Sequence, residues 1–381
     1  MRDPRIDRLA DVIVGYSTKV KKGDLVGIRS DPIAMPLIEA VFEKCLKVGA
    51  HPYWEATASG LDDLLLEHAS DEQLEYLSPL LMQSIETLDV RIVFWAEVNT
   101  KSMSRVDSSK QRLRSAARSP YMKRFMERAA DGGLRWCGTL FPTAASAQDA
   151  EMSLKQYEDF VFAAGMLHLD DPAAAWKRLA ERQQRAVDWL NTKKQLHFRA
   201  PARNGHDGTD LRVSVDGATW INCCGGENFP DGEVFAGPQG VDGHVNYTFP
   251  AVHNGREVDG IRLAFKGGRV IDASARRNEE FLIAMLDQDE GARNLGEIAI
   301  GTNYSIKECS RNTLFDEKIG GTFHAAVGAG YPESGNSNES GLHWDMVCDL
   351  RPDAGGGSIT ADGEEFFRDG RFLFDGWPSP E

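Results

Sequence analysis

The stretch SGLHWDMVCDL, residues 340–350, predicts a β-strand whose two faces differ in chemistry. Side chains alternate across a strand, so every second residue shares a face. One face is wholly apolar and consists of Leu342, Trp344, Met346, Cys348 and Leu350. The opposite face begins with His343 and Asp345, which stand roughly 7 Å apart along such a strand. The apolar face belongs to a core, and the polar pair needs another explanation.

The rest of the second half is also rich in predicted strands. Three stretches alternate apolar and polar residues around Gly-containing turns, the pattern of β-hairpins: LRVSVDG (211–217), REVDGIRLAFKGGRVIDASA (256–275) and ITADGEEFFRDGRFLF (359–374). We therefore expect a sheet-rich α+β domain over residues 196–381.

The first half alternates strands and helices instead. Short predicted strands lie at 25–28, 51–57 and 90–96, with helical spacing between the first two that ends at Gly49. This rhythm predicts a parallel sheet with packed helices. Further helical patterns cover 119–133, 145–167 and 170–194, and the last would close an α/β domain over residues 1–195.

Composition limits the classes of function. The 381 residues include 43 basic and 58 acidic ones, for a net charge of −15, which argues against a nucleic-acid partner. The opening MRDPRIDRLADVIVG is not expected to act as a signal peptide, and no apolar run approaches the ~18 residues of a membrane span. The six cysteines show no CxxC spacing, which favours reduced thiols and a cytoplasmic protein.

Polar residues that can bind metal recur in the second half. The set comprises Glu233 in a Pro- and Gly-rich loop, Glu297 at the head of a short strand, His324, His343 and Asp345. Taken singly, such residues are more often exposed carboxylates or hydrogen-bonded core histidines. Taken together, two imidazoles and three carboxylates suit a pair of divalent cations. Two cations that share a carboxylate and activate a water form a hydrolytic centre.

Several of these stretches resemble the aminopeptidase T / aminopeptidase S family of bacterial metallopeptidases. They are DGEVFAGP (231–238), NLGE (294–297), GGTFHAAVGAGY (320–331) and NESGLHWD (338–345). The first half is similar as well, in 20–30, 36–55 and 135–161. The resemblance covers nearly the whole chain, in the family's order. The segment between Tyr331 and His343 is shorter than in longer members.

The resemblance implies a specific site and activity. The metal-binding positions of the family match Glu233, Glu297, His324, His343 and Asp345. Tyr331 matches a tyrosine beside the metals, either a ligand or a hydroxyl that stabilises the oxyanion, and either Glu297 or Asp345 would bridge the ions. The implied protein is a cytoplasmic, homodimeric aminopeptidase that hydrolyses short peptides with a free N-terminus. Two ions of Zn, Co, Mn or Mg would activate the attacking water.

Other interpretations remain open from the sequence. His324, His343 and Asp345 could hold one Fe(II), as in ring-cleaving dioxygenases of dihydroxypyridine. A hydrolase of another small amide, or a metal-stabilised scaffold without activity, would also use such a site. Glu317 is expected on a solvated face, with an orienting role toward an imidazole as the alternative. His244 and His253 are expected to be exposed or bonded to backbone.

Overall fold

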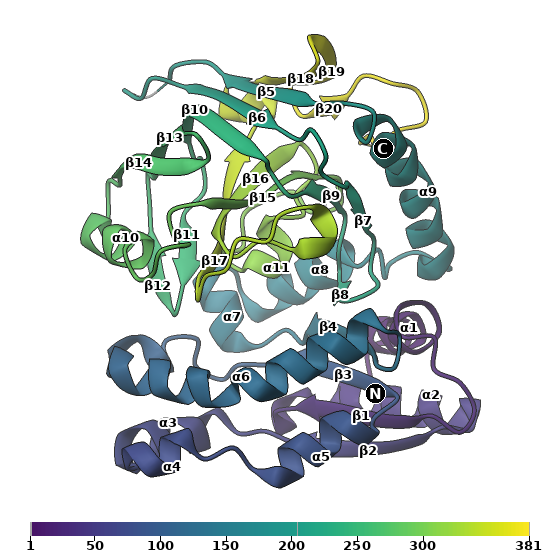
Figure 1. The fold of residues 1–381 in the computed structure, drawn as a ribbon. Coiled ribbons are helices and arrows are strands. Elements are labelled where there is room, and N and C mark those ends of the chain that lie inside the picture. The colour runs from purple at the N-terminus through teal and green to yellow at the C-terminus, as the bar shows by residue number, and fades with distance from the viewer. Residues whose placement is uncertain (1, 204, 381) are drawn as a thin grey trace. The chain divides into compact units, whose positions relative to one another are not determined.

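The computed structural model describes residues 2–203 and 205–380, which form two compact units (Figure 1). The first unit comprises the chain up to Ala173 together with Gly225–Phe229, and the second comprises Ala174–Cys224 and the chain from Pro230 on. Nearly all of helix α9 (Pro172–Leu190), which the sequence assigned to the first half, therefore groups with the second unit. Two folding domains divided at residue 195 stay a prediction.

The first unit contains the predicted parallel sheet. Its strand order is β2-β1-β3-β4-β8, and every neighbouring pair is parallel. The strands are β1 (Leu25–Ser30), β2 (His51–Ala56), β3 (Val90–Trp95), β4 (Arg135–Leu140) and β8 (Asn228–Phe229). The helices are α1 (Pro4–Asp11), α2 (Met35–Val48), α3 (Ser59–His68), α4 (Asp71–Glu75), α5 (Pro79–Thr87), α6 (Ser108–Ala130), α7 (Ala144–Asp149) and α8 (Leu154–Ala164).

Two helix ends show how local sequence sets these elements. Helix α2 stops at Gly49, as predicted, because this residue adopts the left-handed conformation with φ of 87° that glycine accepts without strain. The helical pattern over 145–167 is interrupted, since Glu151 has φ of 59°. Ser153 then caps α8 in a reciprocal arrangement with Gln156 and starts a new helix.

The second unit is built from antiparallel sheets. An eight-stranded sheet has the order β14-β13-β10-β6-β5-β18-β19-β20, a five-stranded sheet the order β17-β16-β15-β9-β7, and β11 pairs with β12. The first sheet consists of β5 (Gln195–Ala200), β6 (Thr209–Ser214), β10 (Gly240–Asn246), β13 (Arg262–Lys266), β14 (Arg269–Ser274), β18 (Ser358–Ala361), β19 (Glu364–Arg368) and β20 (Arg371–Phe372). The others are β7 (Ile221–Cys223), β9 (Glu233–Ala236), β15 (Leu295–Gly301), β16 (Thr322–Gly328), β17 (His343–Asp349), β11 (Ala251–His253) and β12 (Arg256–Val258). Helices α10 (Glu279–Leu286) and α11 (Thr313–Asp316) complete this unit beside α9.

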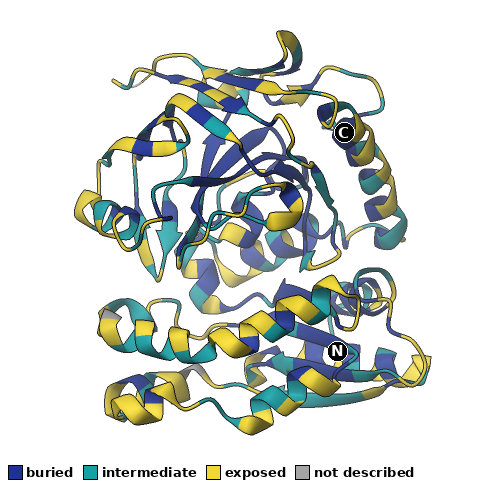
Figure 2. Ribbon diagram, in the orientation of Figure 1, coloured by how far each residue is buried: buried dark blue, intermediate teal, exposed yellow. Residues whose placement is uncertain are grey.

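The two larger sheets share one apolar core. Phe198 of the eight-stranded sheet and Phe323 of the five-stranded sheet lie with ring centroids 4.6 Å apart, and both side chains are buried. Figure 2 shows β15 and β16 buried along their whole length. Trp344 and Met346 of β17 join this core, which confirms the apolar face predicted for 340–350. The opposite face of the five-stranded sheet is therefore the polar one.

The helices and the cysteines bear on the expected surroundings of the chain. No helix in the described ranges is long and apolar enough to cross a bilayer. Cys45 and Cys348 are buried free thiols, and Cys309 is a partly buried one. A cytoplasmic location stays a prediction.

Candidate metal centre

Strand register brings the five predicted ligands onto one face of the five-stranded sheet. Residues directly opposite in an antiparallel pair point to the same side. Asp345 pairs with Ala326, Glu297 pairs with the same alanine from the other side, and Ala299 pairs with His324. Gly301 pairs with Glu233, so β9 adds its carboxylate to this face. Ala326, Ala299 and Gly301 thus lie directly opposite ligands on this face, and their small size leaves room beside the polar groups.

A β-bulge sets the direction of Glu297. The register of β15 against β16 shifts between Leu295 and Glu297, so that Glu297 rather than Gly296 lies opposite Ala326. A side chain at Gly296 would come within 2.3 Å of the carbonyl oxygen of Ala329, so only glycine fits the extra position. The sequence Leu-Gly-Glu therefore turns one carboxylate toward the site.

Backbone carbonyls fix the orientation of both imidazoles. His324 donates from Nδ1 to the Glu317 carbonyl oxygen at 3.0 Å, and His343 donates from Nδ1 to that of Ala329 at 2.8 Å. A carbonyl only accepts, so each Nδ1 carries a hydrogen and each Nε2 faces the carboxylates. Metal-binding histidines are held in this way in known sites.

Each Nε2 lies close to several carboxylates. His324 Nε2 is 3.1 Å from Glu297 Oε1 and 3.3 Å from Glu233 Oε2. His343 Nε2 is 3.5 Å from Asp345 Oδ1 and 3.8 Å from Glu297 Oε2. Glu297 therefore offers a different oxygen to each imidazole. The nearest atom of Asp345 is Oδ1 in both cases, since it also lies 3.9 Å from His324 Nε2.

These carboxylates make both imidazoles strongly basic. Burial alone would lower the pKa of His324, but the hydrogen bond with Glu297 and the nearby carboxylates outweigh it and raise this pKa to about 9. Burial would also lower the pKa of His343, but the charge and hydrogen bond of Asp345, together with Glu297 and the Ala329 carbonyl, outweigh it and raise this pKa to about 10. Without a metal ion, both rings therefore hold a proton on Nε2 at neutral pH. A divalent cation would replace those protons.

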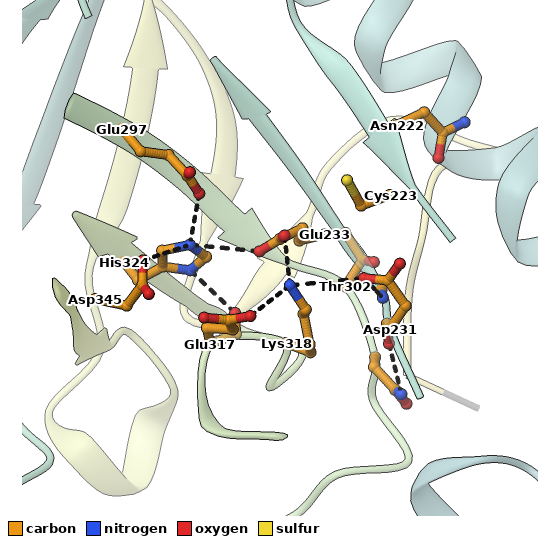
Figure 3. A network of polar contacts seen from close by, with 12 residues as sticks. Asn222, Cys223, Asp231, Glu233, Glu297, Thr302, Glu317, Lys318, His324 and Asp345 are labelled. Carbon is orange, nitrogen blue, oxygen red and sulfur yellow. Dashed lines mark hydrogen bonds and ion pairs between the residues drawn. The ribbon is translucent and has the colours of Figure 1, made fainter. Parts of the chain in front are cut away.

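Lys318 is part of the same cluster and was not predicted. Its side chain is 3% exposed, and Nζ lies 2.5 Å from Glu233 Oε1, 2.6 Å from Glu317 Oε1 and 3.6 Å from Asp231 Oδ1 (Figure 3). The expectation of a solvated Glu317 is wrong, since its carboxylate is paired with Lys318. Its carbonyl, rather than its carboxylate, orients His324. A lysine in FDEKIGGTFH, directly before a buried strand, is the only sequence signal for this contact.

Helix α9 holds the backbone of β9, which carries Glu233. Gln183 of α9 is fully buried and donates from Nε2 to the carbonyl oxygen of Glu233 at 2.8 Å and to that of Cys223 at 2.9 Å. Its Oε1 accepts from Thr302 Oγ1 at 2.9 Å. The sequence placed Glu233 in a loop, whereas the structure places it at the start of a buried strand. No pattern in the local sequence predicts the contact between Gln183 and the backbone of Glu233.

The donor set fits divalent metal ions. The ligand atoms of Glu233, Glu297 and His324 all lie within 4.8 Å of one another, and so do those of Glu317, His324 and Asp345. Among the described residues, the buried Oε2 of Glu233 has no hydrogen-bond partner. Burial raises the pKa of Glu233 to about 7, although Lys318 opposes this, because a buried carboxylate is costly without a cation. Mixed carboxylate and imidazole ligands suit Zn, Co or Mn.

Tyr331 borders this cluster from the segment after β16. Its ring packs edge-on against His343 at 5.2 Å between centroids and against Phe235 at 5.6 Å. Burial, together with Glu297 and Asp345, raises the pKa of the Tyr331 phenol above its ordinary value of 10. Its hydroxyl therefore stays protonated at neutral pH and can donate a hydrogen bond.

His244 and His253 are two further histidines of the second half. His253 is partly buried, with its ring centroid 5.3 Å from that of Trp344. His244 Nε2 lies 3.5 Å from Asp207 Oδ2.

Comparison with protein families agrees with this geometry. The thermophilic metalloprotease (M29) family matches residues 2–372. The chain belongs to this family. This metalloprotease is 30% identical to Aminopeptidase 2 of Geobacillus stearothermophilus, with 98% of each chain covered. It is 29% identical to Aminopeptidase AmpS of Bacillus subtilis (strain 168), over 85% of this chain and 81% of the relative.

A solved structure confirms the fold. Wild-type AmpT from Thermus thermophilus superposes with a TM-score of 0.83 at 24% identity, over 97% of this metalloprotease and 99% of AmpT. The predicted order of a parallel α/β region and a sheet-rich α+β region is therefore confirmed. The family resemblance and the assignment as a metallopeptidase are confirmed as well, and with them a divalent metal cofactor.

Proposed function

We propose that this metalloprotease is an aminopeptidase that removes N-terminal residues from short peptides with the help of two divalent ions. The observation that carries the proposal is the pair of imidazoles that backbone carbonyls lock in place. Each directs Nε2 toward a different oxygen of one carboxylate, that of Glu297. The relatives named aminopeptidase support the choice of exopeptidase chemistry.

The geometry suggests which residues would hold each ion. Glu233, Glu297 and His324 would bind one, and Glu297, His343 and Asp345 would bind the other. Glu297 is favoured over Asp345 as the shared ligand because its two oxygens face the two rings separately. Zn, Co, Mn and Mg remain the candidate ions.

The charge of the cluster also supports two ions. Among the described residues, the cluster contains one ammonium group, that of Lys318, and five carboxylates, those of Asp231, Glu233, Glu297, Glu317 and Asp345. With neutral imidazoles and ionised carboxylates the cluster carries four net negative charges, which two divalent ions would balance. Uncompensated buried charge is strongly unfavourable.

The chain's own residues would position the peptide around these ions. When bound, a pair of divalent ions polarises a carbonyl and lowers the pKa of a water, so that it attacks near neutral pH. The neutral hydroxyl of Tyr331 would donate a hydrogen bond to the carbonyl oxygen as negative charge develops on it. A free N-terminal amine would bind one of these ions or a carboxylate beside them, which would favour unblocked peptides.

Replacing Tyr331 by Phe separates its two candidate roles. We expect kcat to fall by about 10²–10³-fold, as for loss of one oxyanion donor, while bound metal and KM change little. Steady-state kinetics and elemental analysis of the purified variant provide the measurement. Loss of an ion along with activity would instead make Tyr331 a metal ligand.

Hydrolysis of matched peptides tests the proposed function. Protein stripped with a chelator is assayed on unblocked and N-acetylated Leu-peptides before and after addition of Zn²⁺, Co²⁺ or Mn²⁺. We expect metal-restored cleavage of the unblocked peptides only, because an acetylated amine can bind neither an ion nor a carboxylate as a free amine does. Equal cleavage of both forms would contradict selection of a free N-terminus, and no cleavage with any ion would favour a different small amide substrate.

The iron-dioxygenase interpretation has less support. His324, His343 and Asp345 do converge, as that site requires. Glu233 and Glu297 lie even closer to His324, however, and a site with two histidines and one carboxylate needs neither.

We also propose that the enzyme acts in the cytoplasm as a homodimer. The buried free thiols of Cys45 and Cys348 support a reducing compartment. The homodimer rests on the family resemblance alone.

A further inference from the structure

Lys318 divides the acidic cluster into two parts. Its ammonium nitrogen lies 2.5 Å from Glu233 Oε1, 2.6 Å from Glu317 Oε1 and 3.6 Å from Asp231 Oδ1. The other oxygen of Glu233 faces His324. An ammonium group donates three hydrogen bonds and accepts none, so it can serve only as a cation here.

The Lys318 side chain is buried together with the carboxylates that compensate its charge. The side chain is 3% exposed, and those of Asp231, Glu233 and Glu317 are 5%, 7% and 13% exposed. A buried ammonium group is tolerated only beside compensating negative charge, and these carboxylates in turn need a positive partner. Lys318 therefore compensates the charge of Glu233 and Glu317, although the Glu317 carboxylate lies within 4.8 Å of ligand atoms of His324 and Asp345.

We propose that Lys318 is a positioning residue that acts as a built-in cation of the metal centre. It engages one oxygen of Glu233 and the carboxylate of Glu317, and so confines the divalent ions to the side that His324 and His343 face. Glu233 is thereby left as a one-oxygen ligand, and Glu317 is withheld from the ions. The inference rests on the proposed function, since it takes the metal sites as its starting point.

The charge of Lys318 determines whether its replacement strengthens or weakens Mn²⁺ binding. Replacing Lys318 by Met removes a positive charge beside the ions and frees two carboxylates to bind metal. We therefore expect the dissociation constant for Mn²⁺ to fall by at least about tenfold. Turnover at saturating Mn²⁺ should fall by at least about tenfold, because Glu233 is no longer held in place. A lysine that merely stabilised the fold would weaken metal binding and turnover together.

A double-mutant cycle isolates this charge effect. Glu317→Gln alone removes a negative charge and is expected to weaken Mn²⁺ binding by about tenfold. Combining Lys318→Met with Glu317→Gln restores the net charge of the parent, and we expect its dissociation constant within about threefold of the parent value. Lys266→Met, at an exposed lysine of β13, is the matched control and should leave Mn²⁺ binding unchanged.

Calorimetric titration of the metal-free full chain with Mn²⁺, supported by equilibrium dialysis, measures these constants and the number of ions. Weaker or unchanged Mn²⁺ binding in Lys318→Met would overturn the inference. If that variant does not fold, the comparison of Glu317→Gln with the double variant decides, and failure of the double variant to regain affinity contradicts the inference. Absence of Mn²⁺ binding in the parent would instead contradict the proposed function.

Discussion

Glu297→Gln is expected to lower kcat/KM by roughly a thousandfold and to reduce the number of tightly bound ions. The amide keeps the shape of the side chain but loses its charge, and it has one acceptor oxygen where the carboxylate has two. Since Glu297 faces His324 with one oxygen and His343 with the other, both proposed ion sites are affected. Several kcal/mol of transition-state stabilisation by metal ions, at ~1.4 kcal/mol for each factor of ten, give this magnitude.

The experiment compares kinetics, metal content and thermal unfolding of the same preparations. Glu280→Gln, at an exposed position of α10, is the matched control and should behave as the parent does. Asp345→Asn is expected to resemble Glu297→Gln in activity, but to leave the ion beside Glu233 in place. A Glu297→Gln enzyme with full activity and metal content would exclude Glu297 from the metal centre.

Removal of the metal ions is expected to lower the melting temperature by about 10 °C near pH 8. Ions at a thousandfold excess over their dissociation constant stabilise a folded protein by ~4 kcal/mol, and 1 kcal/mol corresponds to roughly 2–4 °C for a unit of about 200 residues. In stripped protein the positive charges of Lys318 and of the two protonated imidazoles only partly balance the buried carboxylates of the described cluster. Calorimetry before and after chelation, with ions added back, measures the shift.

The size of this shift should depend on pH in a defined direction. In the metal-free protein the pKa values of His324 and His343 are about 9 and about 10, above the ordinary value of 6.5. The folded state thus binds protons that the unfolded chain has released. This stabilisation is complete below pH 6.5 and is lost as the pH rises through 9 and 10.

Glu233 acts in the same direction at lower pH, since its pKa is raised to about 7. Its contribution is complete below pH 4.5 and is lost as the pH rises through 7. We therefore expect the melting temperature of stripped protein to fall between pH 6.5 and pH 10, and that of loaded protein to fall less. Parallel curves for the two forms would contradict a metal that replaces these protons.

The sequence was most informative where periodicity has a single interpretation. Alternation over 340–350 placed Trp344 in the core and turned His343 and Asp345 to the other face, as observed. Short strands are harder to recognise. Strand β9 is four residues long between Pro- and Gly-containing stretches, so the sequence made Glu233 a loop residue although it is buried in a sheet.

The contacts that Gln183 and Lys318 make with distant segments could not be predicted. Gln183 reaches the backbone of Glu233 across 50 positions, and Lys318 reaches its carboxylate across 85. The sequence around Gln183 or Lys318 does not identify the partner residue, because these contacts form only when separate elements of the fold pack together. The same holds for the grouping of α9 with the second unit: amphipathic spacing predicts a helix but does not identify the surface that it covers.

The ligand-bearing strands and the segment from Tyr331 to His343 have unequal freedom to vary. Main-chain ladders hold Glu233, Glu297, His324, His343 and Asp345 in neighbouring strands, so a change of loop length elsewhere need not move them. The connecting segment is an irregular stretch with one short helical turn at Pro332–Ser334, and such segments accept insertions and deletions more readily than sheets do. Changes in the length of this segment can thus accumulate during evolution while the five side chains on the sheet keep their places.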